Sequence, residues 1–458
     1  MFTILINSHK HKHEIGVSMY SVKDILQMEV TLALGCTEPV AIALASAAAA
    51  SLIDRSKIDS VEITVDANMY KNALAVSIPG TDGKCGVELA TALGIVEGDH
   101  RKTLEVLSGL THDGLKSAEA LASKKIIKTN INRDIKGIYI NVAIKSGGDT
   151  AEAEIRMFHN NIASMKKNGQ EIPLSSLCDE SDSAKKDIAK MESWLTTLEL
   201  SDLLLMLNDL DEDDFRFIKL GVDTNLKLAE YGMKTGAGLG IGRALERSIR
   251  SKLIKKDMGV AARILASSAS DARMSGVSLP AMSSAGSGNH GLTAILPIWA
   301  VKDFIELDSE KTVLEAIALS HLVTAYIKAH TGRLSAICGC SVAAGAGAAA
   351  GITYMLGGTA NHIAGAIINH THDLAGVVCD GAKAGCSLKL ATAAGTAVTA
   401  SLLSLQGVVV QPTDGLSADS PEQSMKNIGT LASEGMVETD RIILNIMLEK
   451  QFNKNFEL

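Results

Sequence analysis

The sequence predicts an α+β protein in which a largely α-helical domain carries a smaller antiparallel-sheet α+β domain inserted near the N-terminus. Three observations support this fold class. Hydrophobic residues make up 46% of the 458 residues but aromatic residues only 3%, so small and aliphatic side chains must fill a core of closely packed helices. Short β-branched segments alternate with helical ones between residues 55 and 165. From residue 188 onward the pattern is helical nearly throughout, with no clear strand.

The chain divides into five segments. Residues 1–20 are expected to be a disordered extension, although its HKHKH tract could bind a metal and Met19 could be the true start. Residues 21–54 are Ala-rich and are expected to form N-terminal helices of the helical domain. Residues 55–165 are expected to form the α+β domain, in which KGIYINVAIKSGG and TAEAEIRMF are two strands joined by a Gly-Gly turn. The charged, Ser- and Asp-rich residues 166–187 predict a linker, and residues 188–458 complete the helical domain.

Charge and cysteine usage exclude several classes of protein. The chain has 44 basic and 52 acidic residues, a net charge of −8, whereas nucleic-acid binding favours a basic surface with aromatic stacking platforms. Seven cysteines form an odd set, and the apolar run at residues 2–6 is too short for a signal peptide. We therefore expect a protein of the reducing cytoplasm, in which the cysteines serve metal binding or catalysis rather than a disulfide framework.

Three long windows carry no Asp, Glu, Lys or Arg: residues 274–301, 334–372 and 390–413. Each exceeds the roughly 20 residues that span a bilayer. The windows are nevertheless rich in Gly, Ser, Thr, Asn and His, and they lack aromatic belts and flanking basic clusters. We therefore interpret them as buried helices of a soluble protein, with no membrane partner.

Four cysteines lie within 49 residues of one another near the C-terminal end: Cys338, Cys340, Cys379 and Cys386. Their spacing does not give the two C-x2-C pairs of a structural zinc site. They could be small apolar core residues, or soft ligands for zinc, copper(I) or an iron–sulfur cluster. If three of them hold a [4Fe–4S] cluster, its fourth iron is open and can act as a Lewis acid.

Two further segments are candidates for chemistry. Cys36 in LGCTEP precedes an Ala-rich helix, which Thr37 could cap. The helix dipole would lower the pKa of the Cys36 thiol and make it a base or nucleophile. The alternative is that Cys36 only fills a turn. The uncharged stretch SSAGSGNHG places Ser287, Asn289 and His290 beside three glycines, a composition that suits a carboxylate-binding loop better than a flexible one. The glycine-rich segments at 235–242 and 78–84 lack the spacing of dinucleotide-binding and P-loop motifs.

The segments LGCTEPVAIALA, KNALAVSIPGT, GSGNHG, LSAICGCSVAAG and VVCDGAKAGCSLKLA together resemble the L-cysteine desulfidase family, which is related to the iron–sulfur L-serine dehydratases. The resemblance runs from about Val22 to Leu448. It implies an oxygen-sensitive [4Fe–4S] cluster held by three cysteines and a pyridoxal-free elimination that releases pyruvate and ammonia. By this resemblance Cys379 and Cys386 are ligands, and the third ligand is either Cys338 or Cys340.

The same resemblance implies that Cys36 is the acceptor of the substrate's Cα proton, and that Ser287, Asn289 and His290 bind the substrate. We expect a cytoplasmic lyase, a homodimer like the dehydratases, whose helical domain eliminates sulfide from L-cysteine. Three alternatives remain. Cys379-Asp380-Gly381 departs from the C-D-P loop of the dehydratases, which leaves an L-serine dehydratase open. The others are a non-catalytic membrane or transport protein and a zinc- or cluster-binding regulator whose α+β domain senses an amino acid.

Overall fold

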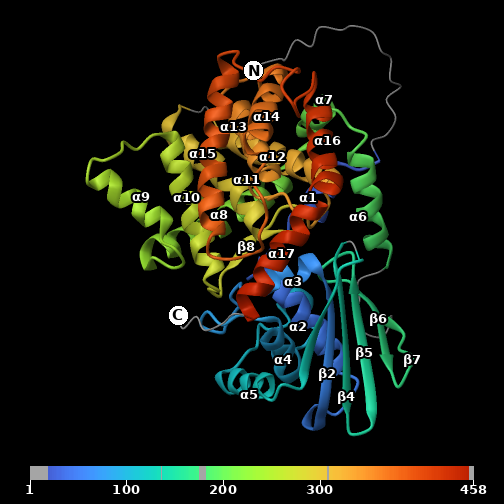
Figure 1. Cartoon of the computed structure of the whole chain (residues 1–458). Coiled ribbons are helices and arrows are strands. Elements are labelled where there is room, and N and C mark those ends of the chain that lie inside the picture. The colour runs from blue at the N-terminus through green and yellow to red at the C-terminus, as the bar shows by residue number, and fades with distance from the viewer. Residues whose placement is uncertain (1–18, 136, 175–181, 307–308, 453–458) are drawn as a thin grey trace.

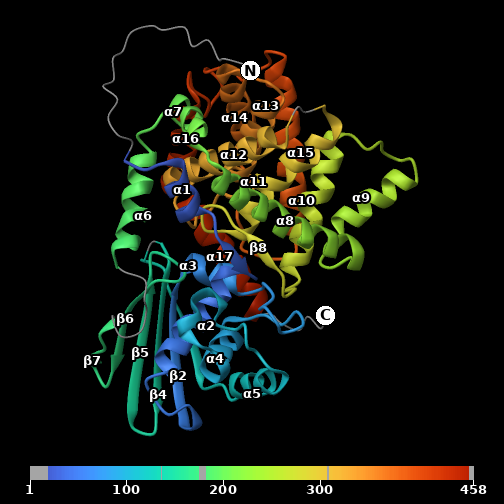
Figure 2. The ribbon, with the colours of Figure 1, turned by 180° about the vertical axis from the view of Figure 1, so that it is seen from behind.

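The computed structural model describes residues 19–135, 137–174, 182–306 and 309–452. Helices account for 59% of the structure, and the remainder includes a six-stranded mixed sheet and a two-stranded antiparallel sheet. The α+β class is therefore confirmed. A region of packed helices lies at one end of the molecule and the six-stranded sheet with its covering helices at the other (Figures 1 and 2).

The six-stranded sheet has the strand order β3-β2-β4-β5-β6-β7. Its strands are β2 (Ile58–Asp66), β3 (Ile127–Asn132), β4 (Tyr139–Ser146), β5 (Asp149–Arg156), β6 (Ile162–Lys167) and β7 (Gln170–Glu171). β4 and β5 pair antiparallel across a Gly147-Gly148 turn, as the sequence predicts. The prediction of a purely antiparallel sheet was wrong, because β2 pairs parallel to β3. A parallel pair needs a long crossover, which the intervening helices provide.

One face of this sheet is covered by α2 (Thr37–Ala50), with α4 (Val87–Glu97) and α5 (His112–Ser123) beyond it (Figure 1). All fourteen residues of α2 are buried. A Cβ at Gly94 would lie 2.2 Å from the carbonyl oxygen of Ala43, so small residues allow α2 and α4 to pack very closely. The assignment of residues 21–54 to the helical domain therefore fits α1 (Val22–Glu29) but not α2, which packs in the core of the sheet region.

The helical region is built around α10, α11, α12, α13, α14 and α15, which pack against one another. At Gly347 and Gly351 of α13, an added Cβ would lie 2.4 Å from carbonyl oxygens of α12, so the close packing expected from small residues is present. The bounds are α6 (Asp182–Leu195), α7 (Leu200–Met206), α8 (Glu212–Thr235), α9 (Ile241–Arg250), α10 (Met258–Met274), α11 (Gly288–Val301), α12 (Glu310–Thr331), α13 (Ala343–Met355), α14 (Ala360–Leu374), α15 (Cys386–Leu405), α16 (Pro421–Thr430) and α17 (Val437–Phe452).

Two strands outside the large sheet join distant parts of the chain. β1 (Leu32–Leu34) pairs antiparallel with β8 (Pro280–Met282). The expectation of no strand beyond residue 188 was therefore wrong at β8. A strand of three residues that begins with Pro280 is too short to show a periodic pattern. The pairing fixes the approach to Cys36 against the start of α11.

The predicted segment boundaries also shift. The linker predicted at 166–187 begins within β6, includes β7 and ends within α6. Residues 1–18, which hold the His-rich tract, lie outside the described residues. Tyr20, assigned to the disordered extension, packs its ring 5.4 Å from that of Trp194.

Two described helices, α12 and α15, are long and apolar enough to cross a membrane by length and composition. Their most apolar windows are 83% and 56% buried within the protein. Burial of this degree is also typical of helices in the core of a folded protein, so these two helices are weak evidence for a membrane span.

Candidate active site

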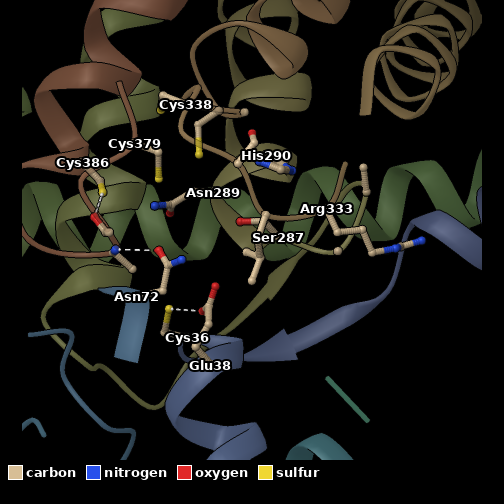
Figure 3. Close-up of a pocket in the computed structure, with 18 of the residues that line it drawn as sticks. Cys36, Glu38, Asn72, Ser287, Asn289, His290, Arg333, Cys338, Cys379 and Cys386 are labelled. Carbon is tan, nitrogen blue, oxygen red and sulfur yellow. Dashed lines mark hydrogen bonds between the residues drawn. The ribbon is translucent and has the colours of Figure 1, made fainter. Parts of the chain in front are cut away.

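All eight residues predicted to form a site line one cavity of about 80 Å³ between the helical and sheet regions (Figure 3). They come from segments separated by more than 300 residues. The eight are Cys36, Ser287, Asn289, His290, Cys338, Cys340, Cys379 and Cys386.

Backbone pairing brings two of the four late cysteines together. Ile337 and Val378 form an antiparallel bridge, and the N–H of Cys338 donates to the Val377 carbonyl at 2.9 Å. Cys338 is therefore opposite Val377, and Cys379 is its diagonal neighbour on the same face. Diagonal neighbours are about 7–8 Å apart, within reach of each other's side chains. Cys386 begins α15, and its sulfur lies near those of Cys338 and Cys379 (Figure 3).

The electrostatics of these thiols reflect their burial. A hydrogen bond from the Cys340 thiol lowers the pKa of Cys338, and the same bond raises the pKa of Cys340. Burial raises the pKa of Cys379, and it raises that of Cys386 to about 12. Thiols in this setting need a partner that binds the thiolate form, and a metal centre is such a partner.

The donor set fits an iron–sulfur cluster better than a single ion. Within the described ranges, no three His, Cys, Asp or Glu side chains converge so as to hold one metal ion. The ligands of a cluster can lie farther apart than the ligands of a single ion, because each thiolate binds a different iron atom. Soft sulfur donors gathered on one side of a buried cavity meet that requirement. Two lysines supply positive charge nearby: Lys389 donates to the Val378 carbonyl at 2.9 Å, and Lys328 lines the cavity.

Cys36 lies at the opposite side of the cavity, at the N-terminus of α2. It is itself the N-cap residue, so the expectation that Thr37 caps this helix was wrong. Its Sγ donates a hydrogen bond to Glu38 Oε2 at 3.0 Å. The predicted lowering of the thiol pKa is also contradicted: burial raises the pKa of Cys36 well above its usual value, and the Glu38 charge adds to the effect. Burial therefore outweighs the partial charge of the helix end.

The stretch SSAGSGNHG forms the N-terminus of α11, with Ser287 as N-cap and no side-chain capping bond. The N–H groups of its first turn therefore keep their capacity to bind an anion. Arg273 lies against this turn, since a Cβ at Gly288 would be 2.5 Å from its Nε. Arg273 Nη2 donates to the Gly35 carbonyl at 2.7 Å, whereas the buried Nε of Arg273 and Oδ1 of Asn289 have no hydrogen-bond partner in the described structure. This arrangement suits a carboxylate.

His290 is held in one orientation. Its Nδ1 lies 3.1 Å from the Ser284 carbonyl oxygen, so Nδ1 carries the hydrogen and Nε2 has the free lone pair. Burial lowers the pKa of His290 to about 3, so the ring is neutral. Its Nε2 faces Gly339, where an added Cβ would be 2.4 Å away. The glycine between Cys338 and Cys340 thus makes room for His290.

The sequence interpretation missed most of the polar lining. Charged side chains surround the cavity. Glu38 lies in the GCTEP motif and Asn72 lies in KNALAVSIPGT. Both therefore belong to segments that carry the family resemblance, but neither was assigned a role. Lys389 lies three residues after Cys386 in the sequence, a spacing at which it could counter the charge of a cluster or reach solvent. The remaining residues carry no local signal, because only the tertiary fold brings them to the cavity. The additional polar lining residues are Glu38, Asn72, His159, Arg273, Lys328, Arg333, Ser335 and Lys389.

Other polar groups that the sequence drew attention to have structural partners. The glycine-rich segment 236–242 is held by Asp271, which accepts from the N–H groups of Leu239 and Ile241 at 3.0 and 2.8 Å. In the 78–84 segment the N–H of Ile78 donates to the Lys84 carbonyl at 2.8 Å, which closes a turn. The buried His370 bonds to the Ser341 carbonyl at 2.7 Å. None of these groups lines the cavity.

Comparison with known proteins links the chain to one family. A sequence profile described as serine dehydratase alpha chain matches residues 101–445. Proteins of that family are iron–sulfur dehydratases. The match includes the α11 turn and the four late cysteines, whereas Cys36 and Glu38 precede it.

Similar full-length proteins carry the name UPF0597 protein. The one from Desulfatibacillum aliphaticivorans is 55% identical over 95% of this chain and 99% of its own length. The one from Desulfotalea psychrophila is 56% identical over 94% and 99%, and the one from Clostridioides difficile is 43% identical over 93% and 98%.

Proposed function

This chain belongs to the serine dehydratase alpha chain family, and on that premise we propose that it is a lyase that eliminates sulfide from L-cysteine without pyridoxal phosphate. The observation that carries the proposal is one cavity with a thiol group, an anion-binding helix end and a set of sulfur donors on its walls. Elimination of a small amino acid needs these three parts: a proton acceptor, a carboxylate site and a centre that stabilises the leaving group.

The α11 N-terminus and Arg273 would bind the substrate carboxylate. Together the N–H groups of the first turn and the guanidinium group offer several donors in a buried place, where charge-assisted hydrogen bonds are strong. Asn289 Oδ1, which has no partner among the described residues, can accept a hydrogen bond from the substrate ammonium group. Bound in this way, the substrate lies between Cys36 and the late cysteines.

Cys36 would take the Cα proton, since it lies across the cavity from the sulfur donors (Figure 3). Cys338, Cys379 and Cys386 are the residues best arranged to hold a [4Fe–4S] cluster. When bound, a cluster would supply an open iron that acts as a Lewis acid on the carboxylate and the leaving group. Breaking the Cα–H and Cβ–S bonds gives hydrosulfide and aminoacrylate, which water converts to pyruvate and ammonia.

The choice of L-cysteine over L-serine rests on the resemblance of GCTEP and CDGAKAGC to the desulfidases. L-serine dehydration on the same scaffold is the second candidate, favoured by the family match. Giving anaerobically reconstituted protein both substrates in parallel separates the two. We expect a higher kcat/KM for sulfide release from L-cysteine than for pyruvate formation from L-serine. A higher value with L-serine would establish the dehydratase instead, and no product from either substrate would refute both.

The role of Cys36 can be tested separately from the cluster. Cys36→Ser should lower kcat by at least about 100-fold, as expected when a general base is removed. Cluster absorbance and iron content should stay at the wild-type level, because Cys36 lies opposite the sulfur donors. Loss of iron in this variant would instead make Cys36 a ligand. Cys85→Ser is a matched control, since Cys85 is exposed and outside the cavity.

A further inference from the structure

Three titratable side chains follow one another at the end of the cavity where Cys36 lies. The Cys36 thiol donates to Glu38 Oε2 at 3.0 Å, and the Thr37 hydroxyl donates to the same oxygen at 3.2 Å. The other carboxylate oxygen, Oε1, lies 3.9 Å from Nε2 of His159. Cys36, Glu38 and His159 all line the cavity, and Figure 3 shows the first two side by side.

We propose that Glu38 accepts the thiol proton of Cys36 and passes it to His159, so that Cys36 meets the substrate as a thiolate. This inference rests on the function proposed above, because it assigns two positioning residues to the same proton transfer. It extends that function with residues from two elements, the start of α2 and the turn between β5 and β6.

A proton acceptor next to Cys36 is necessary because of where the thiol lies. Burial raises the pKa of Cys36, so the thiol keeps its proton at neutral pH and cannot act as a base unaided. Glu38 is the group already bonded to that proton. Arg273 opposes this effect in part, since its charge lowers the pKa of Cys36, and it provides a counter-charge for the thiolate.

His159 is suited to receive the proton next. Its side chain is only 10% exposed, and its Nε2 is buried without a hydrogen-bond partner in the described structure. Burial lowers the pKa of His159, so the ring is neutral with a lone pair available. The charge of Glu38 raises the pKa of His159 in part, and the charge of Arg333, whose guanidinium lies 4.7 Å over the Phe158 ring, lowers it. His159 would therefore release the proton again rather than retain it.

The protons and electrons of this relay balance. The Cys36 proton moves through Glu38 to His159, which gives a thiolate, a carboxylate and an imidazolium. The thiolate then takes the Cα proton, the Cβ–S bond breaks, and its electron pair leaves on hydrosulfide. His159 returns its proton to hydrosulfide or to water. Cys36 is again a thiol, so the three residues return to their starting states.

The decisive variant is Glu38→Gln, which keeps the size of the side chain but removes the proton acceptor. We expect kcat for L-cysteine to fall by at least about 100-fold at neutral pH, although loss of the Glu38 charge makes the thiol easier to ionise, because the thiol proton then has no adjacent group to receive it. Activity should recover as pH rises, because hydroxide can then take the thiol proton. The kinetic isotope effect with α-deuterated L-cysteine should decrease, because formation of the thiolate rather than Cα–H cleavage then limits the rate. Glu38→Asp should keep part of the activity. Glu88→Gln is the matched control: Glu88 also lies in the first turn of a helix, but it bonds to Thr129 outside the cavity.

A second measurement does not depend on turnover. Alkylation of Cys36 by iodoacetamide, followed by peptide mass spectrometry across a pH series, reports the thiol pKa directly. Removing the Glu38 charge should move the midpoint to lower pH, whereas Glu88→Gln and His159→Gln should leave it unchanged. His159→Gln should nevertheless lower kcat.

The outcomes separate the relay from the proposed function. An unchanged alkylation midpoint in Glu38→Gln, or a loss of kcat that is the same at every pH, would overturn the relay while the elimination reaction stands. If the wild-type protein releases no product from either amino acid, the proposed function fails. Should Glu38→Gln not fold, the comparison of Glu38→Asp and His159→Gln with wild type decides the same question through their pH profiles.

Discussion

At the level of single residues, burial in the cavity affects the pKa of the thiols that line it, and the proposed function uses these thiols in two different ways. Burial raises the pKa of Cys36, Cys379 and Cys386, so each must have a specific partner to function as a thiolate. For Cys36 the structure offers Glu38 as an acceptor for the thiol proton and Arg273 as a counter-charge for the thiolate. For the late cysteines the chemistry of the donor set favours iron. The same desolvation therefore acts on the proposed base on one side of the cavity and on the proposed ligands on the other.

The choice between Cys338 and Cys340 gives the first prediction at this scale. Cys338 is the diagonal neighbour of Cys379 across the bridge of Ile337 and Val378, so it is the better-placed third ligand. We expect Cys338→Ala to lose most of the bound iron and Cys340→Ala to retain it. Iron and acid-labile sulfide per chain after anaerobic reconstitution measure the difference. The opposite pattern would make Cys340 the ligand.

At the level of elements, the site is an assembly of helix ends. α2, α11 and α15 each begin at the cavity, with Cys36, Ser287 and Cys386 at or next to their first residues. Helix N-termini carry unsatisfied N–H groups and a partial positive charge. Three of them around one cavity add a positive potential that favours a bound carboxylate, whereas at Cys36 and Cys386 the effect of burial on the thiol pKa is larger.

The glycine at the start of α11 gives the second prediction. In Gly288→Ala, the new Cβ would lie 2.5 Å from Arg273 Nε, so the guanidinium must move while the helix can remain. Losing a charge-assisted hydrogen bond of about 1.5–3 kcal/mol should raise the KM for the substrate roughly 10- to 100-fold, with little change in iron content.

Gly259→Ala is the control for that experiment. Gly259 lies in the first turn of α10, where a new Cβ would have its nearest contact at 3.5 Å, and KM should not change. An unaltered KM in Gly288→Ala would show that this turn and Arg273 do not bind the carboxylate.

The elements also show what the sequence could and could not predict. Motif residues with a strong chemical character can be recognised in the sequence, and Cys36, the α11 turn and the four late cysteines do line one cavity. The helix-rich pattern and the β4–β5 hairpin could be predicted because both depend on local sequence. Arg273, Lys328 and His159 were missed, because each lies in a segment whose pattern is ordinary and only the packing of distant elements directs it to the cavity.

Reasoning from the local sequence also predicted the wrong direction for the pKa shift of Cys36. The position of Cys36 at a helix start is visible in the sequence, and the dipole argument follows from it. The burial of Cys36 against the opposite region, and the bond to Glu38, depend on tertiary structure. Burial and the Glu38 charge therefore change the Cys36 pKa more than the helix dipole does, and neither effect can be predicted from the local sequence.

At the level of the whole molecule, contacts between the two regions lie beside the cavity. Lys71 of α3 (Ala67–Ala73) is 1% exposed and pairs with Asp440 of α17, which runs from the helical region toward the sheet (Figure 1). Asn72 accepts a hydrogen bond from the N–H of Ala382 at 3.0 Å, in the loop between Cys379 and Cys386. The sheet region thereby positions the loop that carries two cysteines. The homodimer and the cytoplasmic location stay predictions.

The Lys71–Asp440 pair gives the third prediction. Asp440→Asn would leave the buried Lys71 ammonium without its carboxylate, which should cost up to about 3 kcal/mol of stability. The midpoint of urea unfolding should fall clearly. Asp213→Asn removes a carboxylate from an ion pair in which both side chains are more than half exposed, and it should have no measurable effect. Equal midpoints for the two variants would contradict a role for Lys71 in joining the regions.

The pairing of β1 with β8 also has a consequence for biosynthesis. At roughly 5–20 residues per second, the roughly 250 residues between these strands take on the order of 10–50 s to translate. During that interval the nascent chain can complete the sheet around α2, while Cys36 has no opposite wall. The cysteines that would bind iron leave the ribosome later still. A cluster held by the late cysteines would therefore be loaded only after Cys36 and the sheet region have been made.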